Sequence, residues 1–446
     1  MSFPIHDNSP VVYGGPPPAG ADVVVLGGGI IGVMTAWALA ERGLSVVLCE
    51  KGRIAGEQSS RNWGWIRQQG RDFAELPIMM ESLALWKQMA VEMPGLGFAQ
   101  HGTMYLARNH GEMFAFETWM AQARGHGLKV QMQSQAQVYS RYDTAAVQWL
   151  GGLFTESDGF AEPWAAVPLL AAGAVRRGAV MVEDCAVRCL DREGGRIVGV
   201  VTELGRIGCD QVVVAGGAWS SLFLRAEGVS IPQLSVLASV AQTTPMAAAF
   251  AGQLADDRIG IRRRADGGYT IAPGGRHDYF IGPDAFRNMG PYLPVMARDF
   301  RSTKFHMRAP QGFPDGWGTA RKWSGDEVSP FERMRILNPA PNMRLLAGAQ
   351  DAFAAAFPGL GRPEIKTAWG GMIDMIPDIV PVIDRVAALP GLVIATGMCG
   401  HGFGIGPGVG RVVADLVTGA QPGHDLTRFR LSRFSDGSKL VPGPTL

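Results

Sequence analysis

The chain has 446 residues, and its 41 Lys and Arg nearly balance its 40 Asp and Glu, which leaves a net charge of +1. This balance gives no general attraction to nucleic acid, and no apolar run approaches the ~18 residues that a transmembrane helix needs. A hydrophobic content of 47% with only 18% charged residues excludes a disordered chain. The five cysteines form no C-x-x-C pair, so we expect reduced thiols, no metal site and a cytoplasmic protein.

A strand, a helix and a second strand are predicted near the start of the chain. Residues 22–26 (DVVVL) are a short apolar run typical of a buried strand, and residues 33–42 carry Ala and Leu at helical spacing. Residues 45–50 (SVVLCE) give the second strand. A unit of about 30 residues is the size that two parallel strands joined by a helix require.

A glycine motif joins the first strand to the helix. Its spacing is Gly27-x-Gly29-x-x-Gly32, and Glu50 ends the second strand. The glycines allow a tight turn, close approach of a pyrophosphate and close packing of strand on helix, while the helix N-terminus offers N–H groups to phosphate. A carboxylate at position 50 suits the two ribose hydroxyls and repels a 2′-phosphate. The motif therefore predicts a site for FAD or NAD and disfavours NADP.

The remaining elements follow in chain order. Residues 52–72 have no regular period and are predicted to be a loop. Helices are predicted at 73–93, 113–124 and 163–177, and strands at 102–107, 179–182, 186–190, 197–203 and 210–215. From residue 229 to about 365, short strand-like segments alternate with Gly and Pro turns, which indicates a mostly antiparallel sheet. A strand at 392–396, a glycine-rich segment at 397–408 and a helix at 409–418 complete the pattern.

These elements predict a fold of the α/β plus α+β class in which two domains interleave. A Rossmann-like FAD-binding domain is assembled from residues 1–95, 160–228 and 366–446. A mostly antiparallel substrate-binding domain takes residues 96–159 and 229–365. FAD is favoured over NAD because glycine-rich turns at 216–219 and 400–406 also follow strands, and they allow two further close approaches to an extended cofactor.

Several segments together carry a family resemblance: VVVLGGGIIG (23–32), SSRNWGWIR (59–67), VVVAGGAW (212–219), WGG (369–371) and ATGMCGHGFGIGPGVG (395–410). In this order and at these distances they resemble the D-amino-acid oxidase and sarcosine oxidase family of flavoproteins. The resemblance implies FAD-dependent oxidation of a C–N bond of an amino acid or amine, with hydride transfer to flavin N5 and hydrolysis of the imine. It implies cofactor contacts from Gly27, Gly29, Ile31, Gly32, Glu50, Lys51, Ser59, Ser60, Arg61, Val187, Ala215, Gly216, Trp219, Gly400, Gly402, Phe403 and Gly404.

The resemblance also points to residues at the substrate. Arg67 matches an arginine that binds the substrate carboxylate in sarcosine oxidases, whereas Ile373 and Gly404 replace two other carboxylate anchors of the family. A salt bridge that holds the loop is the alternative role for Arg67.

Three further residues are candidates for the substrate site. His401, flanked by glycines, is expected near the flavin ring or the substrate. Asp374 lies in a WGG-x-ID segment similar to gamma-glutamylputrescine oxidase, and it either binds backbone or meets a cationic group. Tyr269 is a candidate for the cavity wall.

The mode of FAD attachment and the electron acceptor also follow from the resemblance. Gly371 occupies the position of the cysteine that attaches FAD in sarcosine oxidases, so we expect noncovalent FAD. The lysine with which those oxidases activate oxygen is absent from residues 269–276, so oxygen is expected to be a poor acceptor. The acceptor is either oxygen or, alternatively, a quinone or carrier protein. Two other functions stay open: an FAD-dependent 2-hydroxy-acid dehydrogenase with His401 as base, and an FAD-holding subunit of a hetero-oligomeric amine dehydrogenase.

Overall fold

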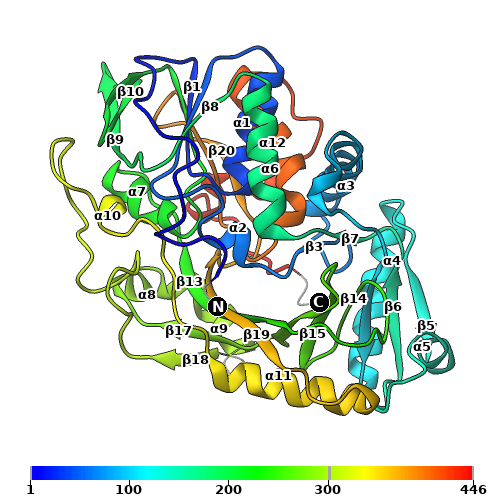
Figure 1. Cartoon of the computed structure of the whole chain (residues 1–446). Coiled ribbons are helices and arrows are strands. Elements are labelled where there is room, and N and C mark those ends of the chain that lie inside the picture. Colours follow the sequence, from blue (N-terminus) through cyan, green and yellow to red (C-terminus); the bar gives the residue numbers. More distant parts are fainter. Residues whose placement is uncertain (1–2, 300–302, 444–446) are drawn as a thin grey trace.

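A mostly parallel sheet forms the upper half of the molecule in the computed structural model, which describes residues 3–299 and 303–443 (Figure 1). Its six strands lie in the order β20 (Val382–Arg385), β21 (Leu392–Thr396), β12 (Gln211–Val214), β1 (Val23–Leu26), β2 (Val46–Cys49) and β8 (Val180–Val182). Only the edge strand β20 runs antiparallel to its neighbour. The central strand β1 is the sequence VVVL with every residue buried, because helices or further strands cover both of its faces.

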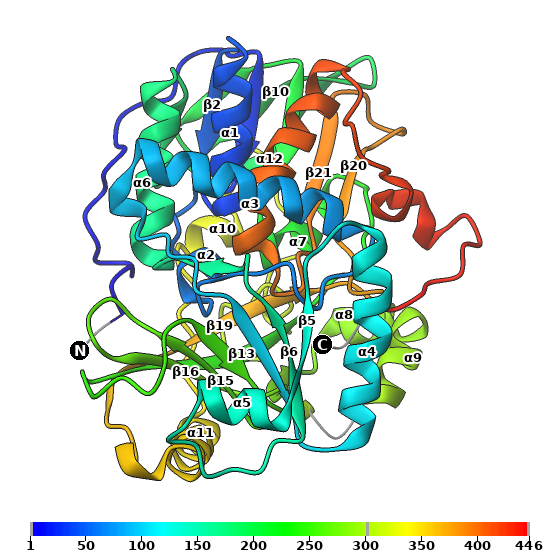
Figure 2. The ribbon, with the colours of Figure 1, turned by 90° about the vertical axis from the view of Figure 1, so that its right-hand side faces the viewer.

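Helices lie on one face of this sheet (Figure 2). The sheet is covered by α1 (Ile30–Glu41), α6 (Pro163–Arg176) and α12 (Gly402–Thr418), and α3 (Glu75–Glu92) packs on α12. Helix α1 packs between α6 and α12, which explains why its residues are apolar on nearly every side. The other face is covered by a small sheet of β9 (Val187–Glu193), β10 (Arg196–Thr202) and β11 (Gly205–Gly208).

A larger, mostly antiparallel sheet forms the lower half of the molecule (Figure 1). Its strands lie in the order β18 (Thr303–His306), β17 (His277–Phe280), β13 (Leu234–Thr243), β16 (Tyr269–Pro273), β15 (Ile259–Arg263), β14 (Gln253–Ala255), β4 (Thr103–Ala107), β6 (Gly151–Thr155) and β5 (Gln131–Ser134), and β19 (Ile365–Met375) also pairs with β13. Helix α11 (Met343–Ala356) packs against β13, β15 and β16. The architecture thus combines a parallel and an antiparallel sheet, as the sequence predicts.

The remaining α-helices and strands lie around these two sheets. They are α2 (Gln58–Arg61), β3 (Trp65–Ile66), α4 (His110–Gly125), α5 (Gln135–Arg141), β7 (Gly159–Phe160), α7 (Ser220–Ala226), α8 (Pro283–Arg287), α9 (Met289–Asp299) and α10 (Pro330–Arg333). The prediction of a loop at 52–72 was therefore incomplete, because α2 and β3 lie within it. Each is too short to show a period in sequence.

The start of the last long helix was predicted wrongly. Helix α12 begins at Gly402, within the segment that the sequence indicated as a glycine-rich turn. The glycines inside the helix serve packing: a Cβ on Gly406 would lie 2.5 Å from Ile30 Cγ1, and one on Gly410 would lie 2.5 Å from the Met34 backbone. Glycine here lets α12 lie directly on α1, so its cost in helix propensity is offset by close contact.

One segment assigned to the FAD-binding domain contributes to both sheets. Strand β19 lies within residues 366–446 for nearly all its length, yet it pairs along β13 in the larger sheet. Strands β20 and β21 of the same segment lie in the parallel sheet. This stretch of chain therefore connects the two halves of the molecule.

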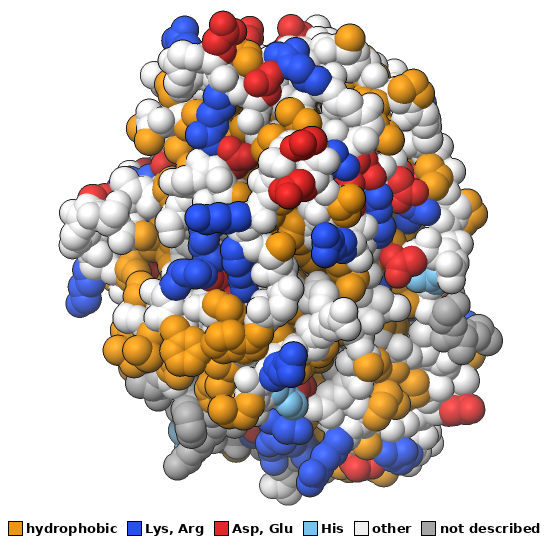
Figure 3. Space-filling view, turned by 90° about the vertical axis from the view of Figure 1, so that its left-hand side faces the viewer, with side chains coloured by type: hydrophobic (Ala, Val, Ile, Leu, Met, Phe, Trp, Pro, Cys, Tyr) orange, Lys and Arg blue, Asp and Glu red, His pale blue; other side chains and the backbone are white. Residues whose placement is uncertain are grey.

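The surface carries charges of both signs. In Figure 3, Lys and Arg side chains are interspersed with Asp and Glu, and hydrophobic side chains gather low on this face. Within residues 3–299 and 303–443, no helix is long and apolar enough to cross a membrane.

Candidate active site

A cavity of about 820 Å³ lies where the two sheets meet. The parallel sheet contributes the glycine turn after β1, Glu50 after β2, and residues 215–219 after β12. The antiparallel sheet contributes residues of β13 and β19, and the turn before α12 closes the cavity from a third direction. Segments more than 300 residues apart in sequence therefore line one space large enough for an extended cofactor.

The glycine turn has the backbone geometry that close approach to a ligand needs. Gly27 has φ +106°, and a Cβ there would lie 2.5 Å from the Ala215 carbonyl oxygen. A Cβ on Gly32 would lie 1.9 Å from the Gly27 carbonyl oxygen, so Gly32 serves helix packing and does not line the cavity. Gly29 and Ile31 line the cavity at the N-terminus of α1, where unpaired N–H groups favour a pyrophosphate. The turn fits the dinucleotide part of FAD.

Glu50 lines the cavity as expected and is held by backbone. Its carboxylate accepts hydrogen bonds from the N–H groups of Gly28 (2.6 Å) and Gly52 (2.7 Å). Burial raises the pKa of this carboxyl group, although Lys51 and the two backbone N–H groups act in the opposite direction. Each carboxylate oxygen retains a second lone pair that can accept a ribose hydroxyl.

Two of the predicted cofactor contacts are used elsewhere. The Lys51 ammonium donates to Glu57 (2.6 Å) and to the carbonyls of Met334 and Arg335 (2.8 Å each), so its three donors are all taken by protein. Ser60 lies outside the cavity wall, and its hydroxyl bonds the Glu57 carbonyl. Local sequence did not reveal these acceptors, two of which lie more than 280 residues away.

Ser59 and Arg61 line the cavity but already hold neighbouring chain. The Ser59 hydroxyl accepts from the Ile30 N–H (2.8 Å) at the start of α1. The Arg61 guanidinium donates to Asn338 (2.7 Å) and to the backbone carbonyl of Gly370 (3.2 Å). Burial lowers the pKa of Arg61 to about 10. Arg61 thus joins α2 to β19 through the floor of the cavity.

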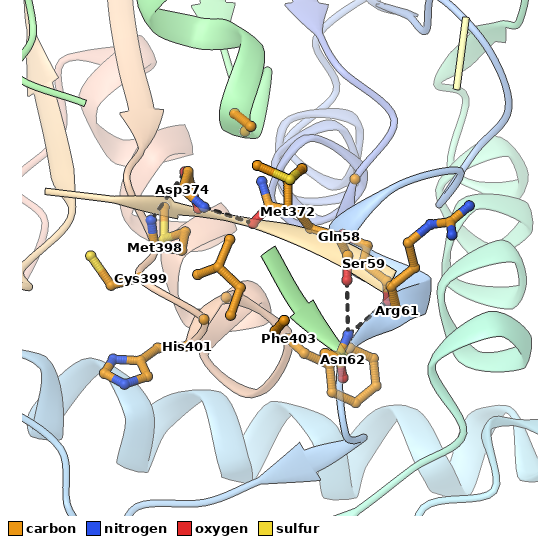
Figure 4. A pocket seen from close by; sticks show the side chains of 18 of the residues that line it. Gln58, Ser59, Arg61, Asn62, Met372, Asp374, Met398, Cys399, His401 and Phe403 are labelled. Atoms are coloured by element: carbon orange, nitrogen blue, oxygen red, sulfur yellow. Dashed lines mark hydrogen bonds between the residues drawn. The ribbon is translucent and has the colours of Figure 1, made fainter. Parts of the chain in front are cut away.

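A network around Asp374 fixes β19 against the turn before α12 (Figure 4). One carboxylate oxygen accepts from the N–H groups of Gly397 (2.8 Å) and Met398 (3.3 Å). With its amide nitrogen facing acceptors, Gln58 donates to the other oxygen (3.0 Å) and to the Met372 carbonyl (3.2 Å). Asp374 is fully engaged, so it takes the backbone-binding role of the two that the sequence left open.

The remaining predicted cofactor contacts divide by orientation. Lining residues are Val187, Ala215, Gly216, Trp219, Gly400, Gly402 and Phe403. Gly404 does not line the cavity: its carbonyl accepts from Ser82 (2.7 Å) and Trp86 (2.9 Å) of α3. Gly404 follows the lining residue Gly402 by two positions, which is more than half a turn around the helix axis. Gly404 therefore faces α3 and not the cavity.

Tyr269 was wrongly predicted to line the cavity. It is fully buried in the core between the large sheet and α11, with its ring centre 5.3 Å from that of Phe353. Its hydroxyl accepts from the Ala249 N–H (2.9 Å). Successive strand residues face opposite sides of a sheet, and Tyr269 faces the side away from the cavity.

Arg67 lines the cavity among aromatic side chains. Its Nη1 donates to the Gln69 carbonyl, and its guanidinium carbon lies 5.6 Å from the centre of the Tyr105 ring. Trp65 and Phe116 also line the cavity. Among the described residues no further acceptor bonds this guanidinium, so N–H groups remain for a ligand.

His401 also lines the cavity, and two residues that the sequence did not indicate support it. Glu75 Oε2 lies 3.5 Å from His401 Nδ1 and 3.3 Å from Arg71 Nη1. Arg71 and Glu75 are almost completely buried, at 2% and 0% side-chain exposure. Burial and the nearby Arg71 cation lower the pKa of His401 to about 4, so its imidazole is neutral at pH 7.

The sequence analysis missed further lining residues, both polar and apolar. They include Gln58, Asn62, Ser239, Met372, Arg276 and His277. Gln58 and Asn62 sit beside the SSR segment that the resemblance singled out, and this position was the available signal. Ser239 and His277 lie on strands of the large sheet, and their orientation depends on strand register.

Comparison with known proteins gives a consistent family. The family model described as FAD dependent oxidoreductase (DAO) matches residues 22–416. Sarcosine oxidase subunit beta from Rhizobium meliloti (strain 1021) is 26% identical over 424 residues, which cover 93% of this chain and 89% of that protein. The L-amino acid deaminase from Proteus myxofaciens, solved in complex with anthranilate, is 31% identical with a TM-score of 0.91 and covers 96% of this chain and 97% of its own.

A second solved structure, also of an enzyme named for an amino acid, has a similar fold. The L-proline dehydrogenase from P. horikoshii is 25% identical, with a TM-score of 0.77 over 95% of this chain and 100% of its own. The glycine turn, Glu50 and the continuous cavity agree with these similarities. The chain therefore belongs to the DAO family of FAD-dependent oxidoreductases and is an enzyme that oxidises a C–N bond of an amino acid or amine.

Proposed function

We propose that the substrate is an amino acid or an N-alkylated amino acid whose carboxylate binds Arg67. The Rossmann-like domain of the parallel sheet would hold FAD along Glu50, the glycine turn and residues 215–219. Arg67 carries the substrate assignment, because its guanidinium lines the cavity and keeps N–H donors that no described residue uses. A guanidinium binds a carboxylate through two parallel hydrogen bonds.

The walls around Arg67 favour a substrate with a large apolar side chain. The ring centres of Trp63 and Trp65 lie 5.2 Å apart, and those of Tyr105 and Phe116 lie 6.3 Å apart. All four line the cavity. Such a wall excludes water from the substrate and so strengthens the ion pair with Arg67. The L-amino acid deaminase and sarcosine oxidase relatives support an amino-acid or N-methyl amino-acid substrate.

The residues position the substrate, and the cofactor provides the redox chemistry. When bound, FAD supplies the two-electron acceptor for the C–N bond. Arg67 binds the carboxylate, the aromatic side chains bury the amino group, and burial favours the neutral amine whose lone pair assists oxidation. The N-terminus of α12, with Gly402 and Phe403 in the wall, places the positive end of a helix dipole at the cavity.

We propose that FAD is held without a covalent bond. Gly371 lies in the cavity wall, and a Cβ there would lie 3.0 Å from Arg61 Cβ. The thiol of Cys399 is buried and donates to the Gly397 carbonyl (3.2 Å). Precipitation with acid should release all the yellow colour into the supernatant, and colour retained in the pellet would contradict noncovalent binding.

The proposed electron acceptor is a quinone or a carrier protein rather than oxygen. Lys51 is the lysine that lines the cavity among the described residues, and Glu57 and two carbonyls hold its ammonium. Reoxidation of the substrate-reduced enzyme should be slow in air and fast with a soluble quinone. Equal rates with the two acceptors would favour an oxidase.

An anaerobic bleaching screen tests the substrate class. Amino acids with large apolar side chains and their N-methyl derivatives should bleach the bound flavin, and 2-hydroxy acids of the same shape should not. Bleaching by hydroxy acids alone would favour the 2-hydroxy-acid dehydrogenase. No bleaching by any compound would favour an FAD-holding subunit, a function supported by the likeness to a subunit of sarcosine oxidase.

A further inference from the structure

The cluster of Arg71, Glu75 and His401 lies behind the substrate end of the cavity, and it deepens the proposed function, on which this inference rests. Glu75 is in the first turn of α3, whereas His401 is the N-cap residue of α12. In Figure 4 the His401 ring extends away from Asp374 toward the helix below it. The carboxylate of Glu75 has no exposed surface, while the imidazole of His401 keeps 17% exposure and lines the cavity.

The two ring nitrogens of His401 have different surroundings. Nδ1 is buried and faces Glu75 Oε2 at 3.5 Å, and no hydrogen bond of normal length satisfies it among the described residues. The ring lines the cavity and keeps 17% exposure, so Nε2 is the nitrogen left to face the cavity. A neutral imidazole carries one N–H, and the atom that it faces decides which nitrogen bears it.

The carboxylate of Glu75 is the acceptor that determines which nitrogen of His401 bears the proton. Burial alone would raise the pKa of Glu75, but the His401 imidazole and the Arg71 guanidinium outweigh burial and lower the pKa. Glu75 is therefore ionised, and its carboxylate can only accept a hydrogen bond from Nδ1–H. The other oxygen of Glu75 has no hydrogen-bond partner among the described residues, so Oε2 is the oxygen that both His401 and Arg71 face.

Arg71 connects this cluster to the proposed carboxylate anchor. Its Nη2 donates to the His401 carbonyl (3.1 Å), and its Nε donates to the Arg67 carbonyl (3.1 Å). One buried guanidinium thus holds the backbone of both cavity residues. Because Glu75 in turn pairs with Arg71, its carboxylate supports the two residues together.

We propose that Glu75 is a positioning residue that fixes His401 as the Nδ1–H tautomer, so that Nε2 accepts a hydrogen bond from the substrate amino group. Arg67 and His401 then bind the carboxylate and the amino group of one amino acid. Burial of the amino group favours its neutral form, which donates one N–H to the unprotonated Nε2. The neutral amine then carries the lone pair that C–N oxidation requires.

Nitrogen NMR of the FAD-loaded enzyme labelled with [15N]histidine tests the tautomer directly. The chain has 8 histidines, and the His401→Asn variant assigns the signal. We expect a protonated Nδ1 and an unprotonated Nε2 in the wild type. In Glu75→Gln the carboxamide can donate to Nδ1, so the tautomer should reverse. A wild-type His401 protonated on Nε2 overturns the proposal, and this result needs no variant of Glu75 to fold.

Kinetics separate positioning from a general structural effect. Glu75→Gln and His401→Asn should each lower kcat/KM for the best amine substrate at least about tenfold. The double variant should fall by less than about threefold beyond His401→Asn, because the two residues act through one contact. Independent, fully additive losses would overturn the proposal.

A matched control lies on the same helix. Glu81 pairs with Arg411 and His424 outside the cavity, so Glu81→Gln should leave kcat/KM and the His401 signals unchanged. If no amine is oxidised but the tautomer is as expected and reverses in Glu75→Gln, the substrate proposal fails while the positioning of His401 stands. If an amino acid is oxidised but His401 is protonated on Nε2, the substrate proposal stands while the positioning role of Glu75 fails.

Discussion

Two clusters of Glu, His and Arg join the same pair of helices, and they differ mainly in burial. Near the cavity, Glu75 of α3 lies 3.5 Å from His401 and 3.3 Å from Arg71. Farther along α3, Glu81 accepts from Arg411 of α12 (2.9 Å) and lies 2.5 Å from His424 Nε2. The outer carboxylate is 28% exposed and the inner one 0%.

The contacts of the outer cluster are shorter, yet the inner cluster should have the larger effects. Water screens the outer charges and can replace any partner that is lost. In the inner cluster a lost partner leaves a charge buried without compensation. Burial, more than distance, therefore decides how strongly each carboxylate influences stability and chemistry.

The largest expected difference concerns stability. Glu75→Ala leaves the Arg71 guanidinium buried without its carboxylate, and we expect a loss of about 3–5 kcal/mol in the free energy of unfolding. Glu81→Ala should cost less than about 1 kcal/mol. Urea unfolding of the two FAD-loaded variants measures both values. Similar losses for the two substitutions would show that burial does not set the difference.

A pH dependence should come from the inner histidine. The pKa of His401 is lowered to about 4 in the folded protein, against about 6.5 in an unfolded chain. Between these values the unfolded state binds more protons, so stability falls as the pH is lowered from about 6.5 to 4, by up to about 3 kcal/mol. His401→Asn should remove this part of the slope in urea titrations at several pH values. An unchanged slope would mean that the pKa of His401 is the same in the folded and unfolded states.

Arg67 tests whether the inner cluster serves the substrate. Arg67→Ala should raise KM or lower kcat/KM at least about tenfold for an amino-acid substrate, because the buried carboxylate loses its partner and each 1.36 kcal/mol is a factor of ten. Arg67→Lys should recover activity only partly, since an ammonium lacks the planar pair of donors. Arg276→Ala, at an exposed position on the rim, is the matched control. Normal turnover by Arg67→Ala would assign Arg67 to loop structure.

Glu50 offers a third case, a half-buried carboxylate paired with backbone. Glu50→Ala should weaken FAD binding about tenfold, because hydrogen bonds from ribose to a carboxylate are charge-assisted. Titration of the apoprotein with FAD measures the dissociation constant. An unchanged dissociation constant would mean that Glu50 only stabilises the turn, where it accepts hydrogen bonds from Gly28 and Gly52, and does not bind FAD.

Local sequence was sufficient for the first strand, helix and strand, the glycine turn and the choice of FAD. Apolar runs, helical spacing and the glycine interval are short-range properties, and β1, α1 and β2 lie within about two residues of their predicted bounds at most ends. Helix α1 begins at Ile30, three residues before the prediction, because the glycine motif itself enters the first turn. The same local pattern placed Gly29, Ile31 and Glu50 at the cavity.

Side-chain direction and distant partners required the tertiary structure. Tyr269 faces the core and Gly404 faces α3, since strand register and helix rotation decide which side of an element meets the cavity. No pattern in the sequence indicated Glu75 and Arg71, because His401, the cavity residue that both contact, is about 330 residues away. The sequence by itself determined the cofactor and the family, since these depend on local backbone geometry. The Arg67 end of the cavity forms only when folding brings α3, the loop before it and the N-terminus of α12 around the buried Glu75 carboxylate.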